Sequence, residues 1–293
     1  MAEEQLPLFQ LAKPLLERFG RDFFKKAPKT PGVYIMSGDA ERVLYVGQTK
    51  NLRARLGFYK NARPGAVPRK IERLIFRVQS ITWETCPSPV EAQLKENELL
   101  RVHRPRYNVA NTQPQTYSFF GWRIVSGQVE LQLSMDPPMD KSFQWHGAFK
   151  NRSGCRQSFM ALCRLLWARK NQPTDTFDYP VYLNQALNTF TCELPESSGK
   201  MSQMLSHFFE GRSAELLGIL TPEQLPSHAP SLRAYQEGDI ALLDEFFKRG
   251  AKRNFLIRQR RGLDYSLIPQ NQLDDLIVMD RAEGGYHSTK AAP

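Results

Sequence analysis

Residues 31–59 read PGVYIMSGDAERVLYVGQTKNLRARLGFY, and this stretch decides the fold of the first half of the chain. Two runs in it, GVYIM and RVLYVG, are rich in β-branched and aromatic residues, which favour strands. They are joined by SGDA, whose residues favour turns. The pattern therefore predicts an antiparallel β-hairpin.

A helix is predicted beyond the second strand, over residues 50–60. Three large side chains share one face of it: Leu52, Leu56 and Tyr59. Arg55 lies four residues before Tyr59, so the two side chains are neighbours on the helix surface. Because Lys50 and Arg53 add two more positive charges to this short segment, we expect the segment to face an anionic partner.

Three further elements are predicted around this core. Residues 15–26 have the apolar spacing of a helix, and residues 75–86 alternate well enough for a third strand. A later helix begins at Ser88, a good N-cap residue, and must end before Pro105. Glu96 lies beside the apolar face of that helix, where an ionised carboxylate costs free energy unless a cation or metal ion accompanies it.

The second half of the chain begins after the best linker, residues 112–118, TQPQTYS. Strands are predicted at FFGWRIV and VELQLSM, followed by a polar, proline-rich loop and a helix over residues 154–169. Another helix is predicted around Met201–Phe208, and residues 230–280 are predicted to be helical and then mixed. We therefore expect a flexible tail, two domains and a disordered tail, with these bounds: 1–12, 13–112, 119–280 and 281–293.

The charge of the chain favours a polyanionic partner. Forty Lys and Arg against thirty Asp and Glu give a formal net charge of +10. Between Arg42 and Arg77 we count ten Lys or Arg and a single acid, Glu72. Such a local excess is typical of a surface that binds a phosphate backbone.

Other classes of protein are disfavoured by the sequence. The first ten residues, MAEEQLPLFQ, lack the features of a secretory signal, and no apolar run approaches the ~18 residues that cross a bilayer. We expect a soluble, cytoplasmic protein with no membrane contact. The four cysteines are scattered without a C-x-x-C pair, which predicts buried free thiols rather than disulfides or a zinc site.

Three segments together resemble the GIY-YIG nuclease domain found at the start of UvrC-type excision-repair proteins. They are PGVYIM, LYVGQTKNLRARLGFY and EAQLKENELLRVHRPRYN, and the resemblance spans residues 28–112. It implies an α+β fold in which a small, mainly antiparallel β-sheet is flanked by helices, followed by a second mixed, mainly helical domain. One departure is Gln48, where the family usually has lysine.

The resemblance also implies the active-site residues of a metal-dependent endonuclease. Glu96 matches the family's metal-binding glutamate, which implies one Mg²⁺ or Mn²⁺ ion. Arg55 can stabilise a phosphate through its rigid set of donors. Tyr34 or Tyr45 is implied to orient or deprotonate the attacking water. The positions that match the family's catalytic residues are Tyr34, Tyr45, Arg55, Tyr59 and Asn108.

Other cations and the second domain are less specific. Lys50 and Arg53 either hold backbone phosphates of DNA or solvate their helix, and three more DNA-binding candidates are Lys60, Arg69 and Lys70. The segment WHGAFKNRSGCRQSF resembles, in a decayed form, a motif that follows the nuclease domain in UvrC and in its shorter homologue Cho, and FFEGRSAELLGIL resembles a helix of the same region. The family's four-cysteine spacing is lost there, so we expect no iron–sulfur cluster.

A separate hypothesis concerns the N-terminus. Residues 5–9, QLPLF, resemble the peptide with which bacterial repair proteins dock on the sliding clamp. Leu8 and Phe9 suit an apolar pocket, while the Gln5 amide supplies directional hydrogen bonds beside Leu6. The alternative is an apolar segment that packs on its own domain.

Three functions remain open from the sequence. The first is a single-strand DNA endonuclease of excision repair, with or without a damage-recognition partner that loads it. The second is a non-catalytic, clamp-tethered adaptor that binds damaged or structured DNA. The third keeps the enzyme but changes its substrate to branched DNA or RNA, because a fold alone does not select one.

Overall fold

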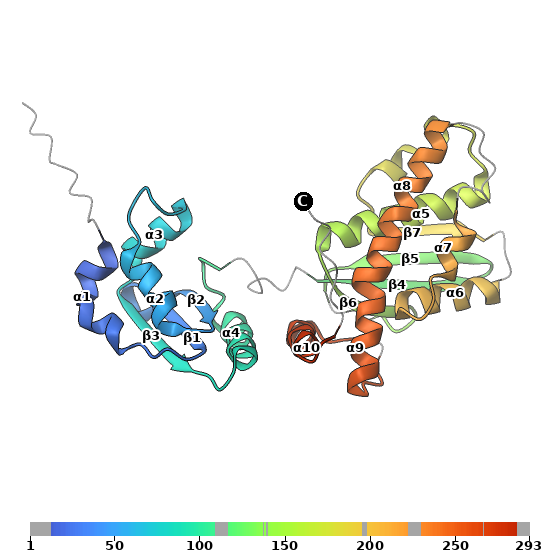
Figure 1. Cartoon of the computed structure of the whole chain (residues 1–293). Helices are drawn as coiled ribbons and strands as arrows, with labels where there is room; N and C mark the ends of the chain where they lie inside the picture. The colour runs from blue at the N-terminus through green and yellow to red at the C-terminus, as the bar shows by residue number, and fades with distance from the viewer. Residues whose placement is uncertain are drawn as a thin grey trace, which may run out of the picture. The chain divides into compact units, whose positions relative to one another are not determined.

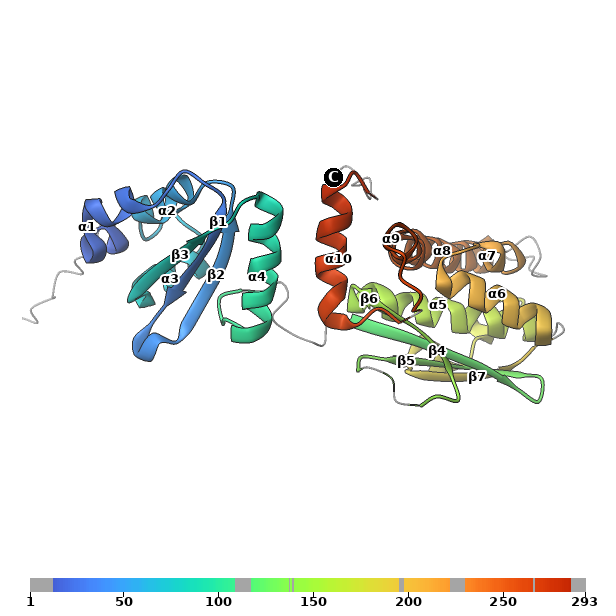
Figure 2. The same cartoon turned by 90° about the horizontal axis from the view of Figure 1, so that it is seen from below.

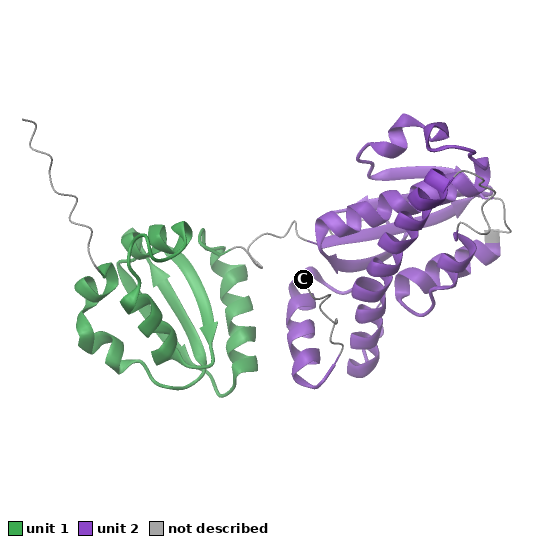
Figure 3. Cartoon of the chain, turned by 45° about the horizontal axis from the view of Figure 1, so that its top comes forward, with its two compact units in different colours: residues 1–113 green, residues 114–293 purple. Residues whose placement is uncertain are grey.

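The computed structural model describes residues 13–108, 117–136, 138, 140–194, 198–221, 230–265 and 267–285. The chain divides into two compact units, residues 1–113 and 114–293 (Figure 3). Each unit has a hydrophobic core of its own. Residues 5–9, the predicted clamp-binding peptide, lie outside the described residues.

The first unit is built on a three-stranded antiparallel sheet. Strands β1 (Gly32–Ser37), β2 (Val43–Thr49) and β3 (Ser80–Thr85) lie in the order β2-β1-β3. The predicted hairpin is confirmed, since β1 pairs with β2 and places Tyr34 opposite Gly47. A 3₁₀ turn at Asp39–Glu41 connects the two strands.

Four helices flank this sheet: α1 (Pro14–Lys26), α2 (Leu52–Asn61), α3 (Arg69–Arg77) and α4 (Pro89–His103) (Figure 1). The Asn51 side chain caps α2 by accepting a hydrogen bond from the Ala54 N–H. Ser88 caps α4 in the same way, as its sequence predicts. Residue Arg104 takes a left-handed conformation and ends α4 before Pro105.

Helix α3 corrects the prediction of a strand over residues 75–86. The strand is confined to Ser80–Thr85, and the residues before it continue a helix to Arg77. Leu74, Ile75 and Val78 are buried, at the one- and three-residue spacing of a helix face. Arg18 of α1 donates hydrogen bonds to the carbonyl oxygens of Phe76 and Val78, which holds the end of the helix. A short apolar run does not distinguish these two structures, and packing against α1 selects the helix here.

The second unit contains a four-stranded antiparallel sheet in the order β6-β4-β5-β7. Its strands are β4 (Tyr117–Val125), β5 (Gln128–Ser134), β6 (Gln144–Lys150) and β7 (Thr189–Glu193). The predicted strands correspond to β4 and β5. Strands β6 and β7, which form the two edges of the sheet, were not predicted.

Helices cover one side of this sheet, as Figure 2 shows for α5, α6 and α8. The helices described in this unit are α5 (Arg152–Asn171), α6 (Ser198–Glu210), α7 (Glu215–Ile219), α8 (Pro230–Phe246), α9 (Arg253–Arg261) and α10 (Gln270–Ala282). A π-helical turn, Phe247–Lys252, joins α8 to α9, and short 3₁₀ turns lie at Thr176–Asp178 and Val181–Asn184. The predicted helix over 154–169 and the one around Met201–Phe208 are confirmed.

Two predicted boundaries move. Strand β4 begins at Tyr117, inside the predicted linker, because this side chain is buried against other apolar residues of the second unit. Helix α10 runs to Ala282, and the Gly285 N–H bonds to the Asp280 carbonyl, so ordered structure continues past the predicted start of the tail at 281. The four cysteines are free thiols, of which three are buried. Within the described ranges, no helix is long and apolar enough to cross a membrane.

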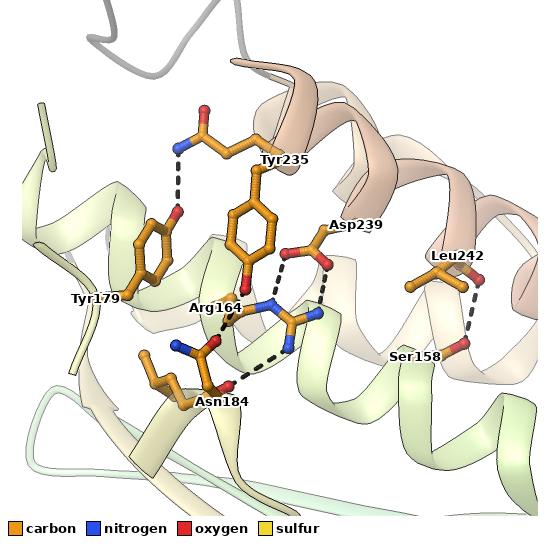
Figure 4. A network of polar contacts seen from close by, with 9 residues as sticks. Ser158, Arg164, Tyr179, Asn184, Tyr235, Asp239 and Leu242 are labelled. Atoms are coloured by element: carbon orange, nitrogen blue, oxygen red, sulfur yellow. Dashed lines mark hydrogen bonds and ion pairs between the residues drawn. The ribbon is translucent and has the colours of Figure 1, made fainter. Parts of the chain in front are cut away.

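A buried polar network ties α5 to α8 (Figure 4). Arg164 donates from Nε to Asp239 Oδ2 at 2.8 Å and pairs through Nη2 with Oδ1 of the same carboxylate. Around this pair, Tyr235 bonds to Asn184 and Gln236 bonds to Tyr179. The Asp239 side chain is only 4% exposed, so each charge depends on the other for compensation.

Replacing Asp239 with alanine is therefore expected to destabilise the second unit by about 3–5 kcal/mol, because it leaves Arg164 buried and unpaired. The control Asp244→Ala removes a more exposed carboxylate that pairs with Lys248 one helical turn later, and it should change stability by less than about 1 kcal/mol. Urea unfolding followed by tryptophan fluorescence measures both. Equal losses in the two variants would contradict the role of the buried pair.

Stability should also depend on pH through His146 of β6. Its Nε2 accepts a hydrogen bond from Trp122 Nε1–H at 3.1 Å, and burial, with a smaller contribution from the charge of Arg258, lowers its pKa from 6.5 to about 3. As pH falls from about 6.5 toward 3, the unfolded chain binds a proton here that the folded chain does not, so stability falls.

We expect the wild-type chain to lose about 2 kcal/mol more than His146→Gln between pH 7 and pH 5. Glutamine keeps an acceptor for Trp122 but does not titrate. Urea unfolding at the two pH values provides the comparison, and parallel losses in both proteins would show that His146 does not carry this dependence.

Candidate active site

Three tyrosines from three elements meet on one side of the first sheet. The ring centroid of Tyr34, on β1, lies 6.0 Å from that of Tyr45 on β2 and 5.8 Å from that of Tyr59 on α2. The Oη atoms of Tyr34 and Tyr59 are 3.4 Å apart. Tyr34 is 0% exposed and Tyr59 2%, whereas Tyr45 is half-buried. Tyr45 therefore forms the accessible edge of the cluster.

Gly47 is required by the close approach of Tyr34. The two residues are partners in the β1–β2 register, and the phenol ring lies over the glycine. A Cβ atom at position 47 would lie 2.4 Å from the Tyr34 Oη and 2.5 Å from its Cζ, well inside van der Waals contact. The second glycine of the sequence motif thus makes room for the first tyrosine.

Arg55 of α2 is held by this aromatic cluster. Its Nε donates a hydrogen bond to the Tyr34 Oη at 2.9 Å, and its guanidinium carbon lies 5.2 Å from the Tyr59 ring centroid and 5.6 Å from that of Phe58. Both aromatic contacts are at cation–π distance. The orientation of the guanidinium is therefore fixed before any ligand binds.

Glu96 approaches the same region from α4, which packs against β2. Its Oε1 accepts a hydrogen bond from the Gln48 N–H at 3.2 Å. Burial raises the pKa of the Glu96 carboxyl, and the Gln48 N–H and the positive charge of Arg55 act in the opposite direction. The ionised carboxylate is only partly compensated, so a further cation beside it would stabilise it.

Asn108 performs a structural task at the site. Its Oδ1 accepts from the Val46 N–H at 3.0 Å, and its Nδ2 donates to the Val46 carbonyl oxygen at 2.7 Å. This pair of bonds ties the chain after α4 to the middle of β2, between Tyr45 and Gly47. The sequence matched Asn108 to a catalytic position, and the hydrogen bonds place it as a brace for the strand that carries Tyr45.

Tyr34 and Tyr59 strongly favour their neutral form. Burial, reinforced by the neighbouring phenols, raises the pKa of Tyr34 far above its usual range. Burial likewise raises the pKa of Tyr59 to about 12. Near neutral pH these two groups can donate and accept hydrogen bonds, but they are poor proton acceptors unless a bound cation lowers their pKa values.

A metal ion could be held here by one carboxylate. Among the described residues, no group of three or more His, Cys, Asp or Glu is placed to bind a metal. Glu96 by itself fits Mg²⁺, which commonly keeps several waters and takes one or two carboxylates from the protein. Its partly compensated charge is the observation that supports this fit.

The five predicted DNA-binding cations are in different situations. Lys50 is exposed, and Lys60 is half-buried on α2. Arg53 donates to the carbonyl oxygens of Ala27 and Lys25 at 2.7 and 3.0 Å, so it also anchors α2 to the end of α1.

Arg69 and Lys70 lie at the start of α3 and line a groove with three arginines that sequence analysis did not single out: Arg73, Arg77 and Arg106. The count of ten cations between Arg42 and Arg77 contained the signal for two of them. That Arg73 and Arg77 lie on the same face as Arg69 follows only from the helical structure of residues 69–77.

Comparisons with known proteins find relatives of this chain. A family model described as a UvrC-like GIY-YIG domain matches residues 30–109. The chain is 28% identical over 239 residues to UvrABC system protein C of Aromatoleum aromaticum, covering 77% of this chain and 37% of that protein. It is 38% identical over 104 residues to the protein of the same name from Trichlorobacter lovleyi, covering 36% and 17%.

Among solved structures, the chain matches the magnesium-bound GIY-YIG N-terminal endonuclease domain of UvrC from Thermotoga maritima, with 29% identity and a TM-score of 0.27. That match covers 30% of this chain and 94% of the other. The chain thus spans well under half the length of the full-length relatives. On the family match and the relatives together, residues 30–109 of this chain form a UvrC-like GIY-YIG domain.

Proposed function

We propose that this protein is a divalent-metal-dependent endonuclease that hydrolyses one phosphodiester bond of DNA, as a single-strand incision in nucleotide excision repair. The observation that carries the proposal is the convergence of Arg55 and Glu96 beside the tyrosine cluster. The first residue offers a fixed positive charge, and the second offers a carboxylate that a cation would stabilise. Relatives named as parts of the UvrABC system support the repair context.

Glu96, Arg55 and Tyr45 have different roles in the proposed reaction. A Mg²⁺ or Mn²⁺ ion on Glu96 would supply Lewis acidity and help to form the nucleophile when it is bound. Arg55 stabilises the negative charge that develops on the phosphate, through the guanidinium donors that its bond to Tyr34 leaves available. Tyr45, at the accessible edge of the cluster, orients the attacking water.

Tyr34 acts on the reaction through Arg55. It is buried and accepts the Arg55 Nε hydrogen bond, and its raised pKa opposes the loss of its proton. These facts favour a positioning role for Tyr34 over the role of base. The proton of the attacking water would then pass to a group other than this phenol.

The partners of the enzyme follow from the same proposal. DNA is the substrate, and a damage-recognition protein directs the enzyme to damaged sites, in line with the assemblies that its relatives are named for. Residues 5–9 would tether it to the sliding clamp. Loss of the arginine or the glutamate would have favoured the adaptor hypothesis, and both residues are present.

Glu96→Gln is expected to reduce the cleavage of DNA by at least about 100-fold, because it removes the charge that holds the metal ion. The matched control is Glu98→Gln on the same helix, whose exposed carboxylate pairs with Lys95 and should not matter. Gel analysis of labelled nicked, branched and adduct-bearing duplexes in Mg²⁺ gives the rates. Binding of Mn²⁺, followed by electron paramagnetic resonance, should be lost in Glu96→Gln alone. Equal rates for the two variants would contradict the assignment.

The roles of Tyr34 and Arg55 are separated by a double-mutant cycle. If Tyr34 positions Arg55, then Tyr34→Phe lowers the single-turnover rate by about 10-fold, Arg55→Ala lowers it by about 100-fold or more, and the double variant is no slower than Arg55→Ala. If Tyr34 activates water independently, the two losses multiply. The single-turnover rates of the four proteins decide between these outcomes.

A further inference from the structure

A second basic surface lies on the first unit. Helix α3 presents Arg69, Arg73 and Arg77 at intervals of four residues, which places them along one face, with Lys70 beside them. With Arg106 and Tyr107, from the chain after α4, they line a groove of about 520 Å³. We infer that this groove, here called the α3 groove, holds the phosphate backbone of the substrate DNA away from the bond that is cut. This inference rests on the proposed function.

The five cations of the α3 groove have no ion-pair partner in the part of the chain that the structure describes. All five are exposed, and within the described residues 13–108 no carboxylate lies at ion-pair distance from any of them. Elsewhere in the structure, many surface cations are paired, such as Lys248 with Asp244 and Arg249 with Glu245. The α3 groove therefore keeps five positive charges available to an outside anion.

This arrangement costs stability, which argues against a purely structural purpose. Arg69 and Arg73 are like charges four residues apart, as are Arg73 and Arg77, and each such pair destabilises a helix by about 0.2–0.5 kcal/mol. Arg69 and Lys70 also occupy the first turn, where the helix dipole is already positive. Bound phosphates would remove both penalties.

The length of the α3 groove fits a polymer better than a small anion. From Arg69 to Arg77 the helix rises about 12 Å, at about 1.5 Å per residue. That distance corresponds to about three to four steps of one DNA strand, at about 3.4 Å each. A single phosphate group would engage only one end of it.

The α3 groove is also continuous with the candidate active site through the chain. Tyr107, which lines it, donates its backbone N–H to the Leu44 carbonyl oxygen at 3.0 Å, and the next residue, Asn108, binds Val46. Both bonds attach the segment to β2, the strand that carries Tyr45. One short segment thus joins the groove to the strand that carries Tyr45. A groove that binds the DNA backbone outside the cleaved bond needs such a connection to the site.

The test measures DNA binding by the full chain carrying Glu96→Gln, so that cleavage does not interfere. Fluorescence anisotropy of a labelled duplex at about 50 to 200 mM salt gives Kd and its salt dependence. We expect Arg73→Gln/Arg77→Gln to weaken binding by at least about 10-fold and to reduce the slope of log K against log salt by about 1 to 2, since each phosphate contact contributes about 0.9.

A matched control removes the same charge elsewhere in the unit. Arg21 and Lys29 are exposed, and Arg21→Gln/Lys29→Gln should change Kd by less than about 3-fold and leave the slope unchanged. The melting temperature of Arg73→Gln/Arg77→Gln should equal or exceed that of its parent, because like-charge repulsion is relieved. If that variant folds poorly, Lys70→Gln/Arg106→Gln tests the same groove from two other positions.

Equal weakening by the groove and control variants would overturn the inference, because net charge alone would then explain binding. Unchanged binding in both groove variants would overturn it too. The result is independent of catalysis: a wild-type chain that binds through the α3 groove but cuts no DNA would contradict the proposed nuclease and leave the groove in place. If the wild-type chain cleaves DNA, then Arg73→Gln/Arg77→Gln in the chain that keeps Glu96 should raise KM and leave kcat within about 2-fold.

Discussion

The contact between the Tyr34 ring and Gly47 is the constraint on which the first unit depends. It needs the β1–β2 register that opposes the two residues, and it needs a glycine, because a Cβ atom there would overlap the phenol. With the ring in place, the Tyr34 hydroxyl accepts a hydrogen bond from Arg55 Nε of α2, and the ring packs against Tyr45 and Tyr59. One close contact in a hairpin therefore orients the cation of the site, and the remaining groups attach to the same strand from α4 and from the chain after it.

Electrostatics then divides the unit into two surfaces of different character. At the tyrosine cluster the charges are few, partly buried and held in fixed geometry, as a transition state requires. On the α3 groove they are numerous and exposed, and no carboxylate among the described residues pairs with them, as a surface for a polymer of phosphates requires. The net charge of +10 is thus not spread evenly. Its local excess lies on the α3 groove, which we infer holds the substrate, and not at the tyrosine cluster, where the chemistry is proposed.

Those parts of the fold in which local sequence signals agree with tertiary packing could be predicted from the sequence. Alternating β-rich runs around SGDA predicted the hairpin, and Ser88 with Pro105 bounded α4 correctly. The alternation of residues 75–86 predicts a strand over the whole run, while burial of Leu74, Ile75 and Val78 against α1 keeps its first residues, up to Arg77, in α3. The positions of the site came from the family resemblance. Their geometry required the structure, since the burial of Tyr34, the backbone bonds of Arg53 and the bracing role of Asn108 arise from contacts far apart in the chain.

The most direct test of the account is a cleavage assay of the purified full chain with and without Mg²⁺. Labelled nicked, branched and adduct-bearing duplexes are incubated with excess protein, and products are resolved on a denaturing gel. The account predicts single-strand incision that requires the metal ion. Binding of these duplexes without incision of any of them, in the presence of Mg²⁺, would contradict it and would favour the adaptor.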